Sequence, residues 1–332
     1  MVLLNPTGIL EKSLCVTIAV GPGAAAECGD LRLAYGLPGV MTKGKGRAPT
    51  LIYSTQTAHP TTVIPADLSL TSVVIGTNVT ATVVITAGPL SGTSFPAGSW
   101  LANDWAPSGR RRILAKFDGA SLPTGRYPYR LDMQINGGTI YSAPGVLLTV
   151  NRADSYFNAG WWLAGLGLLV PYTTSASVSD TLLWVGGDGS VRVFTETAWN
   201  SCIFLHEALD RPDSIVGTPS PGGCVSRSRR SSNGTKVVFD DLSHQHRQTI
   251  NRLGETTNFA YRSSDGKLDS ITVPSGSVVR TYRFQYTGGV LDTIHAPRVI
   301  DPVLRTARSV DTRAPRAIFR SLHWSLHVPS SP

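Results

Sequence analysis

The residues that come nearest to a metal site lie between Asp240 and His246. His244 and His246 stand at i and i+2, which places both imidazoles on one face of an extended strand. Asp240 and Asp241 would add carboxylates to a ligand set suited to transition metals. The segment falls where a hairpin is expected to turn, so a solvent-facing loop explains these residues better than a metal site does. We expect no metal ion and no cofactor.

Other motifs for catalysis are incomplete in this sequence. His206-Glu207 lacks the second histidine of a helical metalloprotease motif. The turns at Asp188-Gly189 and Asp265-Gly266 are too short to surround calcium with six or more oxygens. The sequence also lacks a nucleophile elbow, a P-loop and a dinucleotide fingerprint. We therefore predict that the chain is not an enzyme, with a divergent β-rich hydrolase kept as an alternative.

The four cysteines permit three pairings. Cys15 with Cys28 and Cys202 with Cys224 would each close a short local loop, which an exported location would allow. The spacings are not those of a zinc site. Buried free thiols remain the alternative.

Four tryptophans offer a different chemistry, the stacking of sugar rings. Trp100, Trp105, Trp161 and Trp162 would be the platforms of a secreted carbohydrate- or cell-wall-binding module, whose partner would be a cell-wall glycan. Packing in a core or at a sheet edge is the other interpretation of Trp100 and Trp105.

The region from Gly254 to Pro297 repeats a unit of just over twenty residues. Within each unit aromatic residues alternate, which places them on one face of a strand. A glycine-containing turn follows, and a short apolar strand then returns, Leu268 to Val273 in one copy and Val290 to Ile294 in the other. The unit is thus strand, turn, strand, with an aromatic face that one copy alone cannot bury. The residues that define the repeat are Phe239, Asp240, Gly254, Phe259, Tyr261, Asp265, Gly266, Leu268, Ile271, Tyr282, Phe284, Tyr286, Gly289, Leu291 and Ile294.

At these residues the chain resembles the rearrangement-hotspot (RHS) or YD-repeat family. Tyr261 is followed by Arg262 and Tyr286 by Thr287, where the family has its Tyr-Asp pair, and only Phe239-Asp240 approximates that pair. A second segment, residues 151–166, resembles the one that precedes the repeats in bacterial members, and we call it the lead-in segment. Its matching residues are Gly160, Trp161, Trp162, Leu163, Gly165 and Leu166.

The resemblance implies a function without catalysis. It implies the N-terminal part of a secreted or cell-surface protein, a polymorphic toxin or wall-associated protein, whose β-shell contains and presents a C-terminal toxin absent from this chain. The implied partners are the rest of the shell and that toxin domain. The N-terminus has the order of a signal peptide, interrupted at Gly21-Pro22-Gly23, so we expect a leader that is atypical or missing.

Composition agrees with an all-β chain and gives little support for other partners. The 332 residues include 33 glycines and 22 prolines, and only 16% are charged, which suits short strands and tight turns. Half of the net charge of +8 lies after Pro297, so we expect no nucleic-acid partner. We interpret the small arginine clusters 110–112 and 227–230 as solvated or edge-protecting. The longest apolar run, Trp161 to Pro171, is too short to span a membrane.

The chain divides into four predicted parts: a leader and connecting segment with few strand signals at 1–48, an Ig-like β-sandwich at 49–150, an RHS/YD-type β-hairpin region at 151–297, and a basic tail at 298–332 that is disordered or frame-shifted. Seven strands are expected in the sandwich: Thr50 to Ser54, Leu68 to Ile75, Val79 to Thr86, Arg110 to Phe117, Tyr127 to Ile135, Thr139 to Ser142 and Val146 to Val150. The segment from Leu122 to Tyr129 resembles the turn into a late strand of bacterial Ig-like domains, and the resemblance implies a tyrosine that hydrogen-bonds back across the corner. After Ile294 we expect Phe284 and Tyr286 to present an exposed apolar edge.

Overall fold

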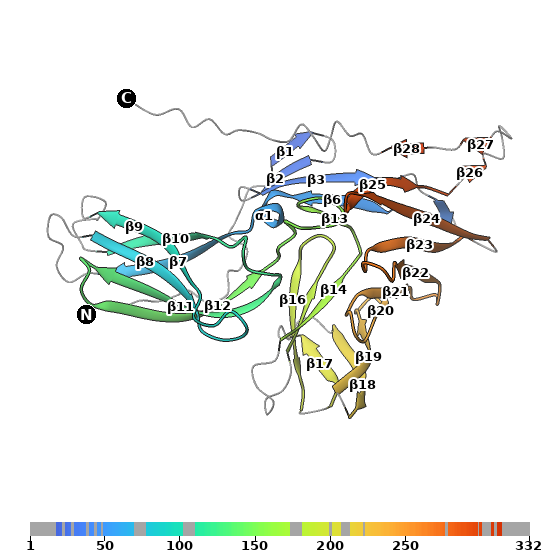
Figure 1. The fold of residues 1–332 in the computed structure, drawn as a ribbon. Helices are drawn as coiled ribbons and strands as arrows, with labels where there is room; N and C mark the ends of the chain where they lie inside the picture. The colour runs from blue at the N-terminus through green and yellow to red at the C-terminus, as the bar shows by residue number, and fades with distance from the viewer. Residues whose placement is uncertain are drawn as a thin grey trace.

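The computed structural model is built almost entirely of antiparallel β-sheets, which confirms the all-β prediction. It describes residues 18–21, 24–27, 30–37, 40–42, 45–47, 49–69, 78–101, 110–172, 181–198, 201–206, 213–221, 223–275, 278–297, 299–300, 307–308 and 311–313. The predictions for Cys15, Cys28, Trp105 and Glu207 lie outside these residues. In Figure 1 a sandwich lies on one side of the molecule and a long sheet on the other, with a smaller sheet between them along the top.

The sandwich consists of two sheets that share one core. Strands β12, β11, β8 and β9 form the larger sheet, and β10 pairs with β7 in the smaller one. Alternate residues of β8 point inward, Val79, Ala81, Val83 and Ile85, because a strand turns successive side chains to opposite faces. The six strands are β7 (Thr61–Ser69), β8 (Asn78–Ile85), β9 (Ser94–Leu101), β10 (Arg110–Asp118), β11 (Gly125–Ile135) and β12 (Ile140–Thr149).

The strands of this region differ from the prediction at three places. Thr50–Ser54 is a strand as predicted, β6, but it pairs with β13 (Trp161–Leu163) outside the sandwich. The two short strands expected between 139 and 150 are the single strand β12. Strand β9 was not predicted, because Pro96 and Gly98 interrupt its alternation, and it pairs with β8 through a register shift.

The predicted corner hydrogen bond is confirmed. The Tyr127 hydroxyl donates to the Pro123 carbonyl oxygen at 2.8 Å, and the ring is buried at the end of the sandwich core. This bond fixes the turn into β11.

A five-stranded sheet lies between the sandwich and the long sheet, in the order β1-β2-β3-β6-β13. Three of its strands come from the segment that carries few strand signals, so the sequence failed to predict them. β1 pairs with β2, β2 with β3, and β3 with β6, so these pairings are local. The run of alanines and glycines in this segment lacks the alternation of apolar and polar residues that would have predicted the strands. The bounds are β1 (Ile18–Gly21), β2 (Ala24–Glu27) and β3 (Asp30–Gly36); a separate hairpin has β4 (Val40–Thr42) and β5 (Lys45–Arg47), and the helix α1 spans Thr55–Ala58.

The long sheet has thirteen strands, β14 to β25 in sequence order followed by β28. Each strand from β14 to β25 is antiparallel to the next along the chain, so this part is a continuous meander. The bounds are β14 (Leu168–Tyr172), β15 (Thr181–Val185), β16 (Val191–Glu196), β17 (Ile203–His206), β18 (Ser214–Ser220), β19 (Gly223–Arg230), β20 (Lys236–Phe239), β21 (His246–Ile250), β22 (Thr256–Tyr261), β23 (Leu268–Ser275), β24 (Val278–Thr287), β25 (Val290–His295) and β28 (Asp311–Arg313); β26 (Val299–Ile300) pairs with β27 (Ala307–Arg308).

The meander winds back on itself. Leu168 of β14 forms an isolated bridge with Gln245, and the Leu169 N–H donates to the His244 carbonyl oxygen. One core runs inside this turn of the sheet, with buried residues from β14 to β20, among them Leu169, Phe194 and Phe239. The strands from β22 onward therefore continue the winding beyond one completed turn.

Candidate functional site

Three successive hairpins of the long sheet share one irregularity. The register shifts between Val238 and Phe239 in β20–β21, between Ala260 and Tyr261 in β22–β23, and between Gln285 and Tyr286 in β24–β25. In each hairpin the shifted residue is the aromatic that precedes the turn. A bulge at this point re-aims the aromatic side chain and increases the twist of the strand. The repeat seen in the sequence is therefore also a structural repeat.

The tyrosines use this geometry to tie each hairpin to the one before it. The Tyr261 hydroxyl donates to the His246 carbonyl oxygen at 2.9 Å, and the Tyr286 hydroxyl donates to the Leu268 carbonyl oxygen at 2.7 Å. His246 is the partner of Phe239 across its hairpin, and Leu268 is the partner of Tyr261. Burial raises the pKa of both tyrosines, so both remain neutral donors. We call this arrangement the tyrosine ladder.

An arginine covers each ring of the ladder. The Arg247 guanidinium lies 5.4 Å from the Tyr261 ring centroid and pairs with Asp240 at 2.9 Å. The Arg262 guanidinium lies 4.7 Å from the Tyr286 centroid and pairs with Asp265. Each arginine thus links a tyrosine ring to an aspartate in a turn, because its cation is attracted both to the face of the ring and to the carboxylate.

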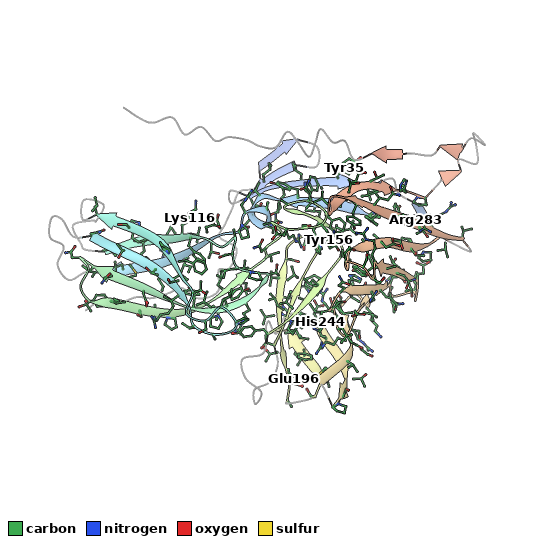
Figure 2. All side chains as sticks on the ribbon, in the orientation of Figure 1. Tyr35, Lys116, Tyr156, Glu196, His244 and Arg283 are labelled. Carbon is green, nitrogen blue, oxygen red and sulfur yellow. A yellow bond between two sulfur atoms is a disulfide. The ribbon has the colours of Figure 1, made fainter. Side chains whose placement is uncertain are left out.

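The lead-in segment covers the aromatic face of these hairpins. The Phe157 ring is fully buried, 6.2 Å from Phe284, and the Tyr156 ring lies 5.9 Å from Tyr286. The Leu291 N–H also donates to the Tyr156 carbonyl oxygen at 2.8 Å. Figure 2 shows Tyr156 between β13 and β23, where the lead-in segment meets the hairpins of the long sheet.

The structure brings most of the predicted residues into one core. Its buried members from the repeats are Leu268, Ile271, Tyr282, Phe284, Leu291 and Ile294, and those from the lead-in segment are Phe157, Trp161, Leu163 and Leu166. Phe259, Tyr261, Tyr286 and Trp162 pack against it in part, whereas Phe239 belongs to the neighbouring core. The expectation that Phe284 and Tyr286 form an exposed edge is wrong, since Phe284 is 3% exposed and Tyr286 is half-buried. The lead-in segment supplies the cover.

Gly160 lets the lead-in segment approach the five-stranded sheet. Its φ is +77°, and a Cβ there would lie 2.6 Å from Ala58 Cβ and 2.9 Å from the Ser54 carbonyl oxygen. A side chain would force the two backbones apart. This contact also explains why β6 pairs with β13.

Two buried charges near the contact between the lead-in segment and the five-stranded sheet, Arg152 and Asp30, were not predicted from the sequence. Arg152 donates to the carbonyl oxygens of Gly186 and Gly187 at 2.7 and 2.9 Å, and its guanidinium lies over the Trp162 ring. Burial lowers the pKa of Arg152 to about 10, so the cation persists at neutral pH. Asp30 accepts hydrogen bonds from Ser54, Thr55 and Gln56. A buried, fully bonded charge has no signature in a single sequence.

The segment from Asp240 to His246 is only partly the solvent-facing turn that was expected. Asp241 is exposed, but His246 is 1% exposed, so the surface-loop interpretation is wrong for that residue. Its Nδ1 accepts the Gly167 N–H at 3.1 Å, and its Nε2 lies 2.7 Å from the Thr249 hydroxyl. The His244 ring instead faces Arg227. The two imidazoles therefore have separate protein partners.

The arginines of the cluster 227–230 also differ from expectation. Arg229 is 6% exposed, pairs with Asp213 at 2.6 Å and lies over the Trp184 ring at 4.0 Å. The solvated interpretation is wrong for this residue, which is an internal cation of the wound sheet. Arg112, by contrast, pairs with Asp67 on the exposed face of β7 and β10.

Cys202 and Cys224 form a disulfide. The buried carboxylate of Glu196 lies against it and accepts the Cys202 N–H at 2.9 Å. These three residues are the group among the described residues whose ligand atoms could meet at one metal ion.

The tryptophans of the glycan-binding alternative are engaged in packing. Trp161 is 6% exposed, and the Trp162 ring contacts Arg152 and Phe157 while its Nε1 donates to the Leu166 carbonyl oxygen. The Trp100 ring lies over Gly98 and packs on the sandwich core. Stacking of a sugar on Trp161 would require the core to open.

A polar cleft of about 170 Å³ lies between β12, α1 and the β15–β16 hairpin. Its lining includes Arg32, Asp188 and Thr149, together with other threonines. It contains neither histidine nor cysteine, so its side chains can hold polar groups but offer no general base that titrates near neutral pH.

Comparison with known proteins gives no assignment, since neither a protein-family model nor a curated protein matches the chain. Among the described residues, no helix has the length and apolar character that crossing a membrane requires.

Proposed function

We propose that this chain is a non-enzymatic scaffold, the beginning of an RHS-type β-shell that contains and presents a C-terminal toxin domain. The observation that carries the proposal is the tyrosine ladder, which joins successive hairpins by the same bulge and the same hydroxyl bond. Such a unit can be added repeatedly, because each new hairpin offers a carbonyl to the next tyrosine. A wound wall of repeated hairpins can enclose a guest, because stacked repeats form a continuous curved surface.

The sandwich is proposed to be an Ig-like domain in front of the shell. Two antiparallel sheets around one core support this, as does the hydrogen bond from Tyr127 to Pro123 at the corner before β11. The sandwich has its own sheets and its own core, so it forms a separate module beside the long sheet.

Export to the cell surface or the medium is part of the proposal. The disulfide between Cys202 and Cys224 supports it, because disulfides persist in oxidising compartments. Intact source cells treated with trypsin should release peptides from this chain under conditions that leave a cytoplasmic marker whole. Peptides found only after lysis would contradict export.

The scaffold role has a separate test in the transcript that encodes the chain. The shell proposal expects it to encode further strand–turn–strand units, each with an aromatic before its turn, and then a domain of unrelated composition. Co-expression of such a toxin domain with the shell segments should yield one complex in which the toxin resists protease. A transcript without such units, or a toxin cleaved as fast in the complex as alone, would overturn the scaffold role.

A further inference from the structure

We propose that Glu196, Cys202 and Cys224 form a zinc site when the disulfide between the two cysteines is reduced. One carboxylate oxygen and the two sulfur atoms lie within 4.8 Å of one another, and all three residues are buried. Thiolates and carboxylates are both zinc ligands, with Zn–S bonds of about 2.3 Å. This inference is independent of the proposed shell function.

The backbone holds the three residues in place without the sulfur–sulfur bond. Glu196 ends β16 and pairs with Phe204 of β17, and Cys224 lies in β19. The Cys202 N–H donates to the Glu196 carboxylate, and the Cys202 carbonyl oxygen accepts the Gly217 N–H at 2.8 Å. The Cα atoms of the two cysteines are 5.4 Å apart, a distance from which both sulfurs can reach one ion. Reduction therefore leaves the three residues on a backbone already in place, and the two sulfurs have only to move apart from their bonded distance to hold one ion.

A dithiol reductant gives two electrons and two protons to the disulfide and becomes a disulfide itself, leaving Cys202 and Cys224 as thiols. Zinc then displaces the two thiol protons to solvent and binds two thiolates and the carboxylate, with water as the fourth ligand. The ion offsets the repulsion that two thiolates and a carboxylate would have in a buried space. The reduced state belongs to a reducing compartment and the disulfide to an oxidising one.

The test uses the full chain with Cys15→Ser and Cys28→Ser, so that Cys202 and Cys224 are the remaining thiols. After reduction with a phosphine, titration with Co²⁺ should give one ion per chain, with the visible bands of tetrahedral cobalt and a thiolate charge-transfer band. Zn²⁺ should displace the cobalt and raise the melting temperature of the reduced chain. The oxidised chain should show neither effect, and this comparison needs no substitution in the site.

Two substitutions distinguish the loss of the Glu196 ligand from a general loss of negative charge. Glu196→Gln should weaken Co²⁺ binding at least tenfold, on the scale of changes around a metal site. Asp154→Asn, which removes an exposed carboxylate in a turn, should leave it unchanged. Absence of one-to-one binding by the reduced chain would overturn the proposal. So would equal binding in denaturant, which is the behaviour of two cysteines on an unfolded chain.

Discussion

The hydroxyl groups of Tyr261 and Tyr286 link successive hairpins of the long sheet. Each donates to a carbonyl oxygen of the preceding hairpin, at 2.9 and 2.7 Å. Removing a hydroxyl leaves the carbonyl of a buried residue, His246 or Leu268, without that donor, whereas the ring and its arginine remain. The loss should equal one hydrogen bond rather than a packing defect.

We expect Tyr261→Phe and Tyr286→Phe each to lower the free energy of unfolding by about 1 kcal/mol. Tyr35→Phe is the matched control, because the Tyr35 side chain is 37% exposed. Urea denaturation followed by circular dichroism measures all three. Equal stability of the four proteins would show that the ladder bonds contribute nothing.

His246 makes the winding of the sheet sensitive to acid. Burial lowers its pKa from the ordinary value of 6.5 to about 3, so the fold keeps the imidazole neutral and able to accept the Gly167 N–H. The unfolded chain takes up a proton at the ordinary value, and this favours unfolding. The contribution of His246 is therefore complete above pH 6.5 and is lost progressively as the pH falls toward 3.

The melting temperature should accordingly fall between neutral pH and about pH 4.5, above the range in which carboxylates titrate. His246→Asn should lower stability at neutral pH and flatten this dependence, while His59→Asn, at an exposed histidine, should leave the profile unchanged. A profile of the same slope in His246→Asn would refute the assignment.

At the scale of elements, the lead-in segment is the part on which the last hairpins depend. Phe157 is fully buried among residues of β23, β24 and β25, although it lies more than a hundred residues before them. Its removal opens a cavity at the centre of that core.

Phe157→Ala should destabilise the chain by about 3 to 5 kcal/mol, the cost of deleting a large buried aromatic. Leu253→Ala, in the exposed turn between β21 and β22, should change stability by no more than about 0.5 kcal/mol. Thermal unfolding measures both. A small effect of Phe157→Ala would mean that the lead-in segment does not cover the repeats.

The return strands β23 and β25 were predictable because local alternation and a glycine turn specify them. The corner hydrogen bond was also predictable, because the Tyr127 hydroxyl and its acceptor lie only four residues apart in a recognisable turn. The pairing of β6 with β13 and the cover of Phe284 by Phe157 were not, because they join segments that no local pattern connects. Both sets of aromatic residues were identified in the sequence, but not that they form one core.

At the scale of the whole molecule, the sheet completes a turn where β14 meets the start of β21, and its later hairpins are closed by a segment of the same chain. The apolar face is therefore satisfied internally, and association through that face is not required for folding.

Hydrogen exchange of the last repeat tests this closure most directly. In the native chain the amides of β24, including Phe284 and Tyr286, should exchange as slowly as those of the sandwich strand β11. Phe157→Ala should bring the β24 amides to fast exchange while β11 stays protected, and Leu253→Ala should leave both protected. Fast exchange at Phe284 and Tyr286 in the native chain, with β11 protected, would contradict the account that the lead-in segment closes the wall.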